Sequence, residues 1–208
     1  MLILAADSAA AYGSIALADE NGVREEVLIE APQGFSHVLF GAIEALLKRQ
    51  NVRLGDIDLF AAASGPGSFT GVRVGLSAMK GMAEVCGKPI VALSNLDALS
   101  AFGKSDARAV VIDAHRGEVY AAVYDGAGNA ILPEVVLPFG QVLTMLEGRT
   151  VEWISQEPLP AVTSPIVLAP RALAGAVALL APNRAPQNPA AIEANYVRRS
   201  DAEIFFRG

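Results

Sequence analysis

The segment that most restricts the fold is rich in glycine and lies where an apolar run changes into a helical pattern. It has the sequence ASGPGSFTGVRVGLSAMKG, from Ala63 to Gly81, and it follows the apolar run DLFAAA. A strand, a glycine-rich turn and then a helix N-terminus is a setting in which backbone N–H groups can hold an anion. The segment therefore predicts an α/β fold in which this turn is either a phosphate site or a tightly packed structural turn.

Known phosphate-binding fingerprints match this turn poorly. A Walker A loop ends in Gly-Lys-Ser/Thr, whereas Gly71 is followed by Val72 and Arg73. A dinucleotide-binding fold has an acidic residue at the end of the next strand, but the run PIVALS ends in Ser94. We interpret the turn as at most a vestigial phosphate site, whose candidate residues are Asp7, Ser8, Gly65, Gly67, Ser68, Thr70 and Gly71.

The residues around this segment predict a regular order of elements. Three strands joined by short turns are expected over residues 1–8, 13–19 and 23–31, followed by an amphipathic helix over 36–50. A buried strand over 58–64, a helix over 70–86 and a strand over 89–94 complete the first part. This order resembles the ribonuclease-H-like lobe of the sugar-kinase, heat-shock-protein and actin superfamily.

The strand, turn and strand pattern starts again at residues 109–125, so we predict two lobes, 1–103 and 104–208. Helices over residues 141–148 and 170–181 are assigned to the second lobe. The expected fold is α/β and actin-like or heat-shock-protein-like, with a mixed sheet in each lobe.

The helix over 70–86 has two apolar faces beside its polar stripe. Val72, Leu76, Met79 and Ala83 form one face, and Gly71, Gly75, Ala78 and Met82 form the other. Glycine inside a helix lowers the stability of the helix by about 1 kcal/mol relative to alanine. The presence of glycine at Gly75 and Gly81 therefore requires an explanation. Either both faces serve the core, or the second face docks a partner helix. The expected partner-interface residues are Leu39, Ile43, Leu46, Gly71, Val74, Gly75, Ala78 and Met82.

The sequence offers few candidates for catalytic residues or metal ligands. Asp7 and Asp113 each follow the first strand of a half, where an ATP-binding member of the superfamily would hold Mg²⁺. The alternative that we favour is a carboxylate that accepts hydrogen bonds from nearby backbone amides. His37 and His115 cannot form an HxxxH metal pair, and there is no GxSxG nucleophile motif. We predict no catalytic residue, metal site or cofactor.

Composition restricts the partners and the compartment. The formal net charge is −6, and no run of Lys and Arg offers the basic surface that direct nucleic-acid binding requires. Hydrophobic residues make up 52% and charged residues 18%, which favours a stable partner. A single cysteine, Cys86, and the lack of a signal peptide or a membrane-length apolar run predict a cytoplasmic protein without membrane contact.

Four motifs together resemble the TsaB family, also called YeaZ: GPGSFTGVRVGLSAMKG, ILAADSA, IDAHRGEVY and YVRRSDA. This family is a degenerate paralogue of TsaD, the catalytic subunit of tRNA threonylcarbamoyladenosine formation. The resemblance implies that the metal-binding histidines of TsaD correspond to Asn95 and Leu99, so the metal site would be lost. It also implies that the helices over 36–50 and 70–86 pack against matching helices of TsaD.

The resemblance predicts a non-catalytic activator subunit that pairs with a TsaD-type enzyme, with a TsaE-type ATPase in the larger complex and tRNA bound only through the complex. It leaves open a homodimer of the free protein and an ATP or ADP at the partner interface. The alternatives are a stand-alone ATP-dependent phosphotransferase or metalloprotease, and a homodimeric nucleotide-binding module. If Gly75 faces the partner, Gly75→Arg should abolish binding and leave the fold intact.

Overall fold

The structure, a computed structural model, describes residues 1–197, which form two compact units. The first unit comprises Met1–Ala98 and Pro170–Ala194, and the second comprises Leu99–Ala169 and, of the described residues, also 195–197. The sequence placed the boundary near Lys104 and kept everything after it in the second lobe. The structure instead changes units at Ala98 and returns residues 170–194 to the first unit.

The first unit is built on a mixed sheet with the strand order β3-β2-β1-β4-β5. Strands β1, β2 and β3 pair antiparallel, whereas β4 and β5 extend the sheet parallel to β1. The bounds are β1 Ile3–Asp7, β2 Tyr12–Asp19, β3 Gly22–Glu30, β4 Leu59–Ala63 and β5 Ile90–Leu93. The three-strand meander expected from the sequence is therefore confirmed.

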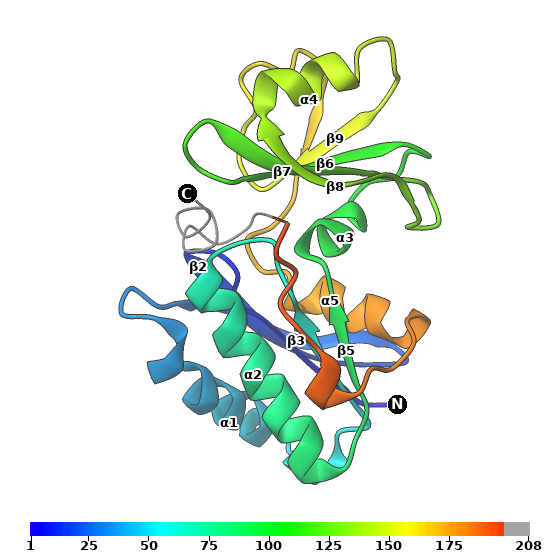
Figure 1. Cartoon of the computed structure of the whole chain (residues 1–208). Helices are drawn as coiled ribbons and strands as arrows, with labels where there is room; N and C mark the ends of the chain where they lie inside the picture. The colour runs from blue at the N-terminus through cyan, green and yellow to red at the C-terminus, as the bar shows by residue number, and fades with distance from the viewer. Residues whose placement is uncertain (198–208) are drawn as a thin grey trace. The chain divides into compact units, whose positions relative to one another are not determined.

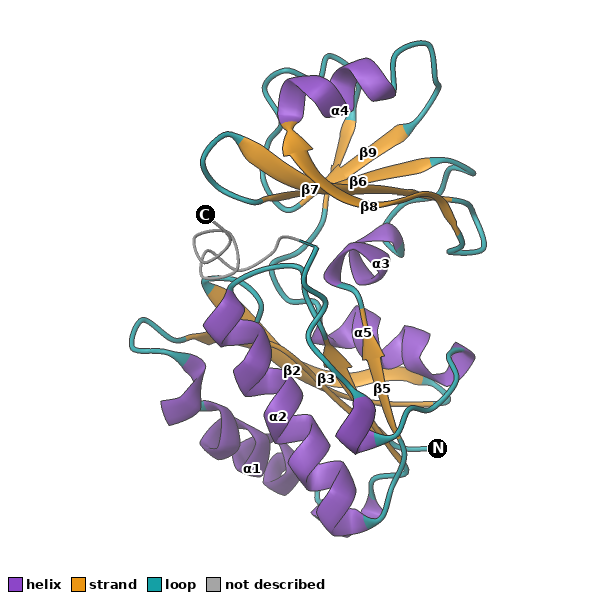
Figure 2. Cartoon of the chain, in the orientation of Figure 1, coloured by secondary structure: helices purple, strands orange, loops and turns teal. Residues whose placement is uncertain are grey.

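Helices cover both faces of this sheet, as Figures 1 and 2 show. Side chains of β1 alternate between two hydrophobic clusters, Leu4 and Ala6 in one and Ile3 and Ala5 in the other. The first cluster lies under α1 and α2, and the second lies under α5. The helices are α1 Leu39–Arg49, α2 Phe69–Cys86, α3 Asn95–Ser100 and α5 Ala174–Leu180, with short 3-10 turns at Phe35–His37, Leu54–Asp56, Ala181–Asn183 and Pro189–Ala191.

Helix α5 belongs to the first unit because polar groups of β2 and β3 hold its N-terminus. The Ser14 hydroxyl accepts hydrogen bonds from the N–H groups of Leu173 (3.0 Å) and Ala174 (2.8 Å). The Glu26 carboxylate accepts one from the Gly175 N–H (2.7 Å). These are N–H groups that a helix cannot satisfy internally. The assignment of this helix to the second lobe is corrected accordingly.

The second unit repeats the topology of the first. Its sheet has the order β10-β9-β6-β7-β8, in which β6, β7 and β8 pair antiparallel and β9 and β10 pair parallel beyond β6. The elements are β6 Arg108–Asp113, β7 Glu118–Tyr124, β8 Ala130–Pro138, α4 Phe139–Met145, β9 Glu152–Ser155 and β10 Ile166–Leu168. In both sheets the first strand is central and is followed by an antiparallel hairpin. The predicted fold, with a mixed sheet in each half, is confirmed.

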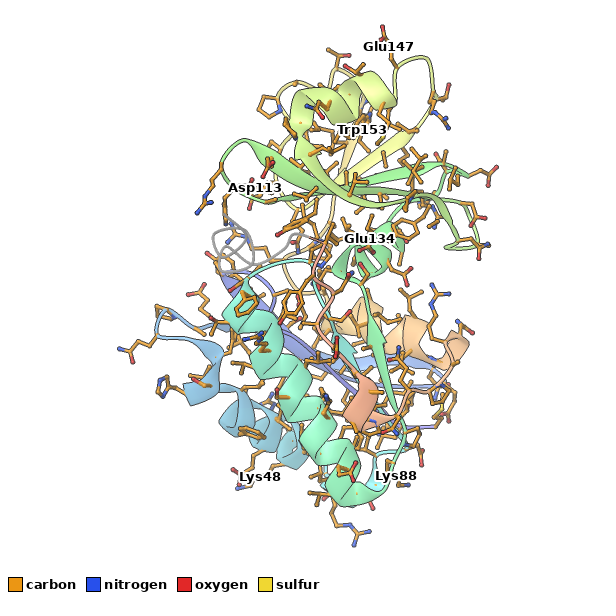
Figure 3. All side chains as sticks on the ribbon, in the orientation of Figure 1. Lys48, Lys88, Asp113, Glu134, Glu147 and Trp153 are labelled. Atoms are coloured by element: carbon orange, nitrogen blue, oxygen red, sulfur yellow. The ribbon has the colours of Figure 1, made fainter. Side chains whose placement is uncertain are left out.

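Helix α4 closes the core of the second unit. Val142 and Leu146 pack with Trp153 of β9, whose ring meets that of Phe139 edge to face at a centroid distance of 6.1 Å. Figure 3 shows Trp153 beneath this helix. The helix predicted over residues 141–148 is therefore present.

Candidate functional site

The predicted phosphate turn lies against the turn that joins β1 to β2. The Ser68 N–H donates a hydrogen bond to the Ala9 carbonyl oxygen (2.6 Å). A Cβ at Gly67 would overlap the same carbonyl oxygen, and a Cβ at Gly71 would overlap the carbonyl oxygen of Ser8. Backbone therefore packs directly on backbone here, which explains glycine at both positions.

The Ser8 hydroxyl joins this turn to the first turns of α2. It donates to the Gly71 carbonyl oxygen (2.7 Å) and accepts from the Gly75 N–H (3.0 Å), two groups one helical turn apart. Ser8 is buried, and a Cβ at Gly75 would overlap its hydroxyl oxygen. Gly75 is thus glycine because a side chain of the same protein fills the space beside it.

Asp7 and Asn95 form a buried polar pair next to this contact. The Asn95 side-chain amide donates to Asp7 Oδ1 (3.0 Å) and accepts from the Gly65 N–H (2.9 Å), and the Ala9 N–H also donates to Asp7 Oδ1 (3.0 Å). Burial raises the pKa of Asp7, and the hydrogen bonds that Asn95 and the Ala9 N–H donate to Oδ1 oppose part of that rise. The prediction that Asp7 accepts hydrogen bonds from backbone amides is confirmed. The bridging role of Asn95, where the resemblance places a metal ligand, was not foreseen.

These residues do not fit the phosphate groups of a nucleotide, which the fold family implies. A phosphate site needs backbone N–H groups that point at the ligand. The N–H groups of Gly65, Ser68 and Gly71 donate to Asn95, Ala9 and the Ser68 hydroxyl, respectively. Of the vestigial phosphate candidates, Ser68 and Thr70 are exposed, and the remaining ones are buried or half-buried in this packing.

Most of the predicted partner-interface residues lie in the core of the first unit. Leu39, Ile43 and Leu46 of α1 are at most 3% exposed, and Ala78 and Met82 of α2 join the same cluster. Gly71 and Gly75 are buried against Ser8, and Val74 is half-buried. Both apolar faces of α2 therefore serve the core. This corrects the expected interface, because side chains that pack inside the chain are unavailable to a partner.

A different surface of these two helices is open to solvent. We define the outer face as the exposed residues Phe40, Gly41, Glu44, Ala45 and Lys48 of α1 and Phe69, Arg73, Ser77, Gly81, Glu84 and Val85 of α2. Phe40 is 60% exposed and Phe69 is 43% exposed, with the Arg73 guanidinium 3.6 Å from the Phe69 ring centre. Lys48 is labelled on α1 in Figure 3. The spacing of three and four residues along each helix could have revealed this stripe in the sequence.

The second predicted carboxylate, Asp113, lies at the end of β6 in an exposed hairpin (Figure 3). Its Oδ1 accepts from the His115 N–H (2.8 Å), and its Oδ2 lies 3.2 Å from the His115 ring. Asp7 holds the N–H two residues later in the same way. The backbone-capping interpretation is thus confirmed for both aspartates.

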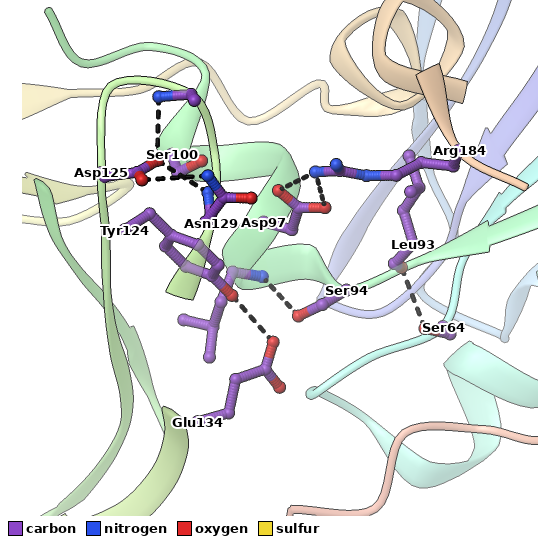
Figure 4. A network of polar contacts seen from close by, with 12 residues as sticks. Ser64, Leu93, Ser94, Asp97, Ser100, Tyr124, Asp125, Asn129, Glu134 and Arg184 are labelled. Atoms are coloured by element: carbon purple, nitrogen blue, oxygen red, sulfur yellow. Dashed lines mark hydrogen bonds and ion pairs between the residues drawn. The ribbon is translucent and has the colours of Figure 1, made fainter. Parts of the chain in front are cut away.

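Other polar contacts stabilise each unit. Figure 4 shows the bidentate ion pair between Arg184 and Asp97 and the hydrogen bond from Ser64 to the Leu93 carbonyl in the first unit. In the second unit, Glu134 accepts from Tyr124 (2.9 Å) and Asn195 (2.7 Å). The C-terminal motif extends past Val197, so its residues 198–202 lie outside the described residues.

Within residues 1–197, no three His, Cys, Asp or Glu side chains gather where they could hold a metal ion. No helix in the same range is long and apolar enough to cross a membrane.

Comparison with known proteins assigns the chain to a family. Residues 29–179 match the TsaD family model, described as tRNA N6-adenosine threonylcarbamoyltransferase. The chain is 34% identical over 138 residues to the Bacillus subtilis tRNA threonylcarbamoyladenosine biosynthesis protein TsaB, covering 65% of this chain and 60% of that protein. It is 32% identical over 163 residues to TsaB of Escherichia coli, covering 74% and 70%, respectively.

A solved structure from Pseudomonas aeruginosa, an uncharacterized protein with similarity to peptidase YEAZ, has a similar fold. Its TM-score is 0.77 at 24% identity, over 95% of this chain and 99% of that chain.

Proposed function

Because the chain belongs to the TsaB family, we propose that it is the non-catalytic subunit of a tRNA threonylcarbamoyladenosine system and acts by binding a TsaD-type enzyme. The observation that carries the proposal is the family match at 32% identity over 70% of the E. coli protein's length. The partner would transfer the threonylcarbamoyl group to the adenosine beside the tRNA anticodon.

The chemistry of the predicted site supports a non-catalytic role. Phosphotransfer needs groups that bind the phosphates of a nucleotide, and it needs a charged side chain that binds the metal ion. Here the turn residues bond one another, and Asp7 Oδ1 accepts hydrogen bonds from the Ala9 N–H and the Asn95 side chain. A metalloprotease needs a ligand set such as HxxxH, whereas the resemblance aligns those positions with Asn95 and Leu99. Both of the enzymatic alternatives are therefore less well supported than the activator.

The outer face of α1 and α2 is our proposed docking surface. It combines exposed aromatic rings, Phe40 and Phe69, with small residues at the middle of each helix, Ala45 on α1 and Ser77 and Gly81 on α2. Small residues let a second pair of helices approach closely, and aromatic side chains are typical anchors of an interface. We propose that the same face pairs two copies when the partner is absent.

The charge of the chain supports the proposal that the partner makes the tRNA contacts. With a net charge of −6, the isolated chain lacks the clustered Lys and Arg that neutralise phosphates. We propose that it works in the cytoplasm, alongside a TsaE-type ATPase, and reaches tRNA only within the complex.

Reconstitution tests this function. The TsaD-type protein of the same genome is assayed for threonylcarbamoyl transfer to tRNA, with and without this chain. We expect transfer to depend on the chain and to persist in Asp7→Asn, which removes the only buried carboxylate of the turn. Transfer that is independent of the chain would refute the activator role, and transfer abolished by Asp7→Asn in a folded, partner-bound protein would refute the non-catalytic one.

A further inference from the structure

We infer that the glycine-rich loop binds the chain's own β1–β2 turn and not a phosphate. We further infer that Ser8 is the positioning residue that fixes α2 onto this turn. A nucleotide at a partner interface would then have to be held by groups outside this loop.

The first support is the direction of the hydrogen bonds. The Ser68 N–H donates to the Ala9 carbonyl oxygen of the turn, and the Gly65 N–H donates to Asn95. In return, the Ser8 hydroxyl of the turn donates to the Gly71 carbonyl oxygen. An anion bound by these two N–H groups would have to compete with the internal acceptors Ala9 and Asn95. Since the acceptors are covalently part of the chain, they are present at a concentration that no free phosphate reaches.

The second support is the pattern of glycines. Gly67 and Gly71 face backbone oxygens of the turn, so no change of a turn side chain could make room for a Cβ there. Gly75 differs, because its nearest neighbour is the Ser8 hydroxyl oxygen and the next atom is Ser8 Cβ at 3.5 Å. Removal of the hydroxyl would leave an ordinary van der Waals contact. Ser8 and Gly75 therefore depend on each other, whereas a Cβ at Gly67 would meet atoms of Ala9 and none of Ser8.

This difference gives a double-mutant cycle with an internal control. Gly75→Ala and Gly67→Ala are each made in the wild-type chain and in Ser8→Ala, and unfolding by urea is measured. We expect Gly75→Ala to raise the unfolding equilibrium constant at least tenfold more in the wild type than in Ser8→Ala. Gly67→Ala should have the same effect in both backgrounds.

Failure of a variant to fold is also informative. If Gly75→Ala alone does not fold but the double variant does, the inference is supported. Equal effects of Gly75→Ala in both backgrounds, or no folded variant in either, would overturn the role of Ser8.

Calorimetry with ATP and Mg²⁺ tests the exclusion of phosphate independently of any partner. Ser68→Asp keeps an N-cap acceptor at the start of α2 and adds a negative charge where a phosphate would lie. We expect either no saturable binding or binding that Ser68→Asp leaves unchanged. Saturable binding to the wild type that Ser68→Asp removes would overturn the inference. Neither experiment uses the TsaD-type protein, so their failure is distinguishable from failure of the proposed function.

Discussion

Gly81→Arg separates the fold of this chain from its proposed docking. Gly81 is exposed on the outer face of α2, and a Cβ added there meets nothing within 4 Å. Arginine is a better helix former than glycine by roughly 0.8 kcal/mol. The free variant should therefore unfold about 2 °C above the wild type, since 1 kcal/mol corresponds to about 2–4 °C for a domain of this size.

The same change should break the docking. Helices that pack through small residues have axes about 8–10 Å apart, which leaves no room for an arginine side chain between them. Steric overlap and the desolvation of a cation at the centre of an interface cost about 4 kcal/mol or more, which is about a thousandfold in affinity. The assay is calorimetric titration of the variant with the TsaD-type partner, beside thermal unfolding of the variant alone.

Two further arginine variants serve as controls. Gly140→Arg, in the first turn of α4, also adds a side chain to open space and should change neither stability nor affinity by much. Gly75→Arg should instead unfold the chain, because the side chain would overlap the Ser8 hydroxyl. That outcome would reverse the sequence-based expectation for Gly75. Wild-type affinity in a folded Gly81→Arg variant would show that the outer face is not the docking surface.

Three other predictions concern buried polar groups, and each is checked by urea unfolding. Burial raises the pKa of Asp7 in the folded state, so its ionised carboxylate destabilises the folded chain more at pH 7 than at pH 4. This destabilisation decreases as the pH falls through the folded-state pKa toward the ordinary value near 4. Asp7→Asn should therefore gain stability relative to the wild type more at pH 7 than at pH 4, and the opposite trend would contradict the role of burial. Asn95→Leu should cost about 2–4 kcal/mol because it leaves buried partners unsatisfied, and a neutral effect would show that water replaces the amide. Ser14→Ala should cost about 1–3 kcal/mol by removing the acceptor for the N-terminus of α5, and an unchanged stability would mean that apolar packing alone holds the helix.

Local patterns in the sequence were sufficient to predict the elements from β1 to β5 and the new strand pattern at residues 109–125, whereas α3, β8, β9 and β10 were not predicted. The continuous apolar run of β1 and the three-to-four-residue spacing in α1 depend on neighbours in the chain, which the sequence displays directly. The capping roles of Asp7 and Asp113 are equally local, since each carboxylate binds an N–H two residues away. The motifs at both ends and in the middle were enough to identify the family.

Tertiary contacts decided which faces of α2 are buried and to which unit α5 belongs. Helix α2 has two apolar faces in sequence, and only the approach of Ser8, more than 60 residues earlier, shows that the glycine face is internal. Helix α5 has small apolar residues that could pack on either sheet. Its position depends on Ser14, 160 residues from Ala174, whose hydroxyl satisfies the N-terminus of the helix. Such long-range pairs leave no periodic trace in the sequence, because the two partners are brought together only when the sheet has formed.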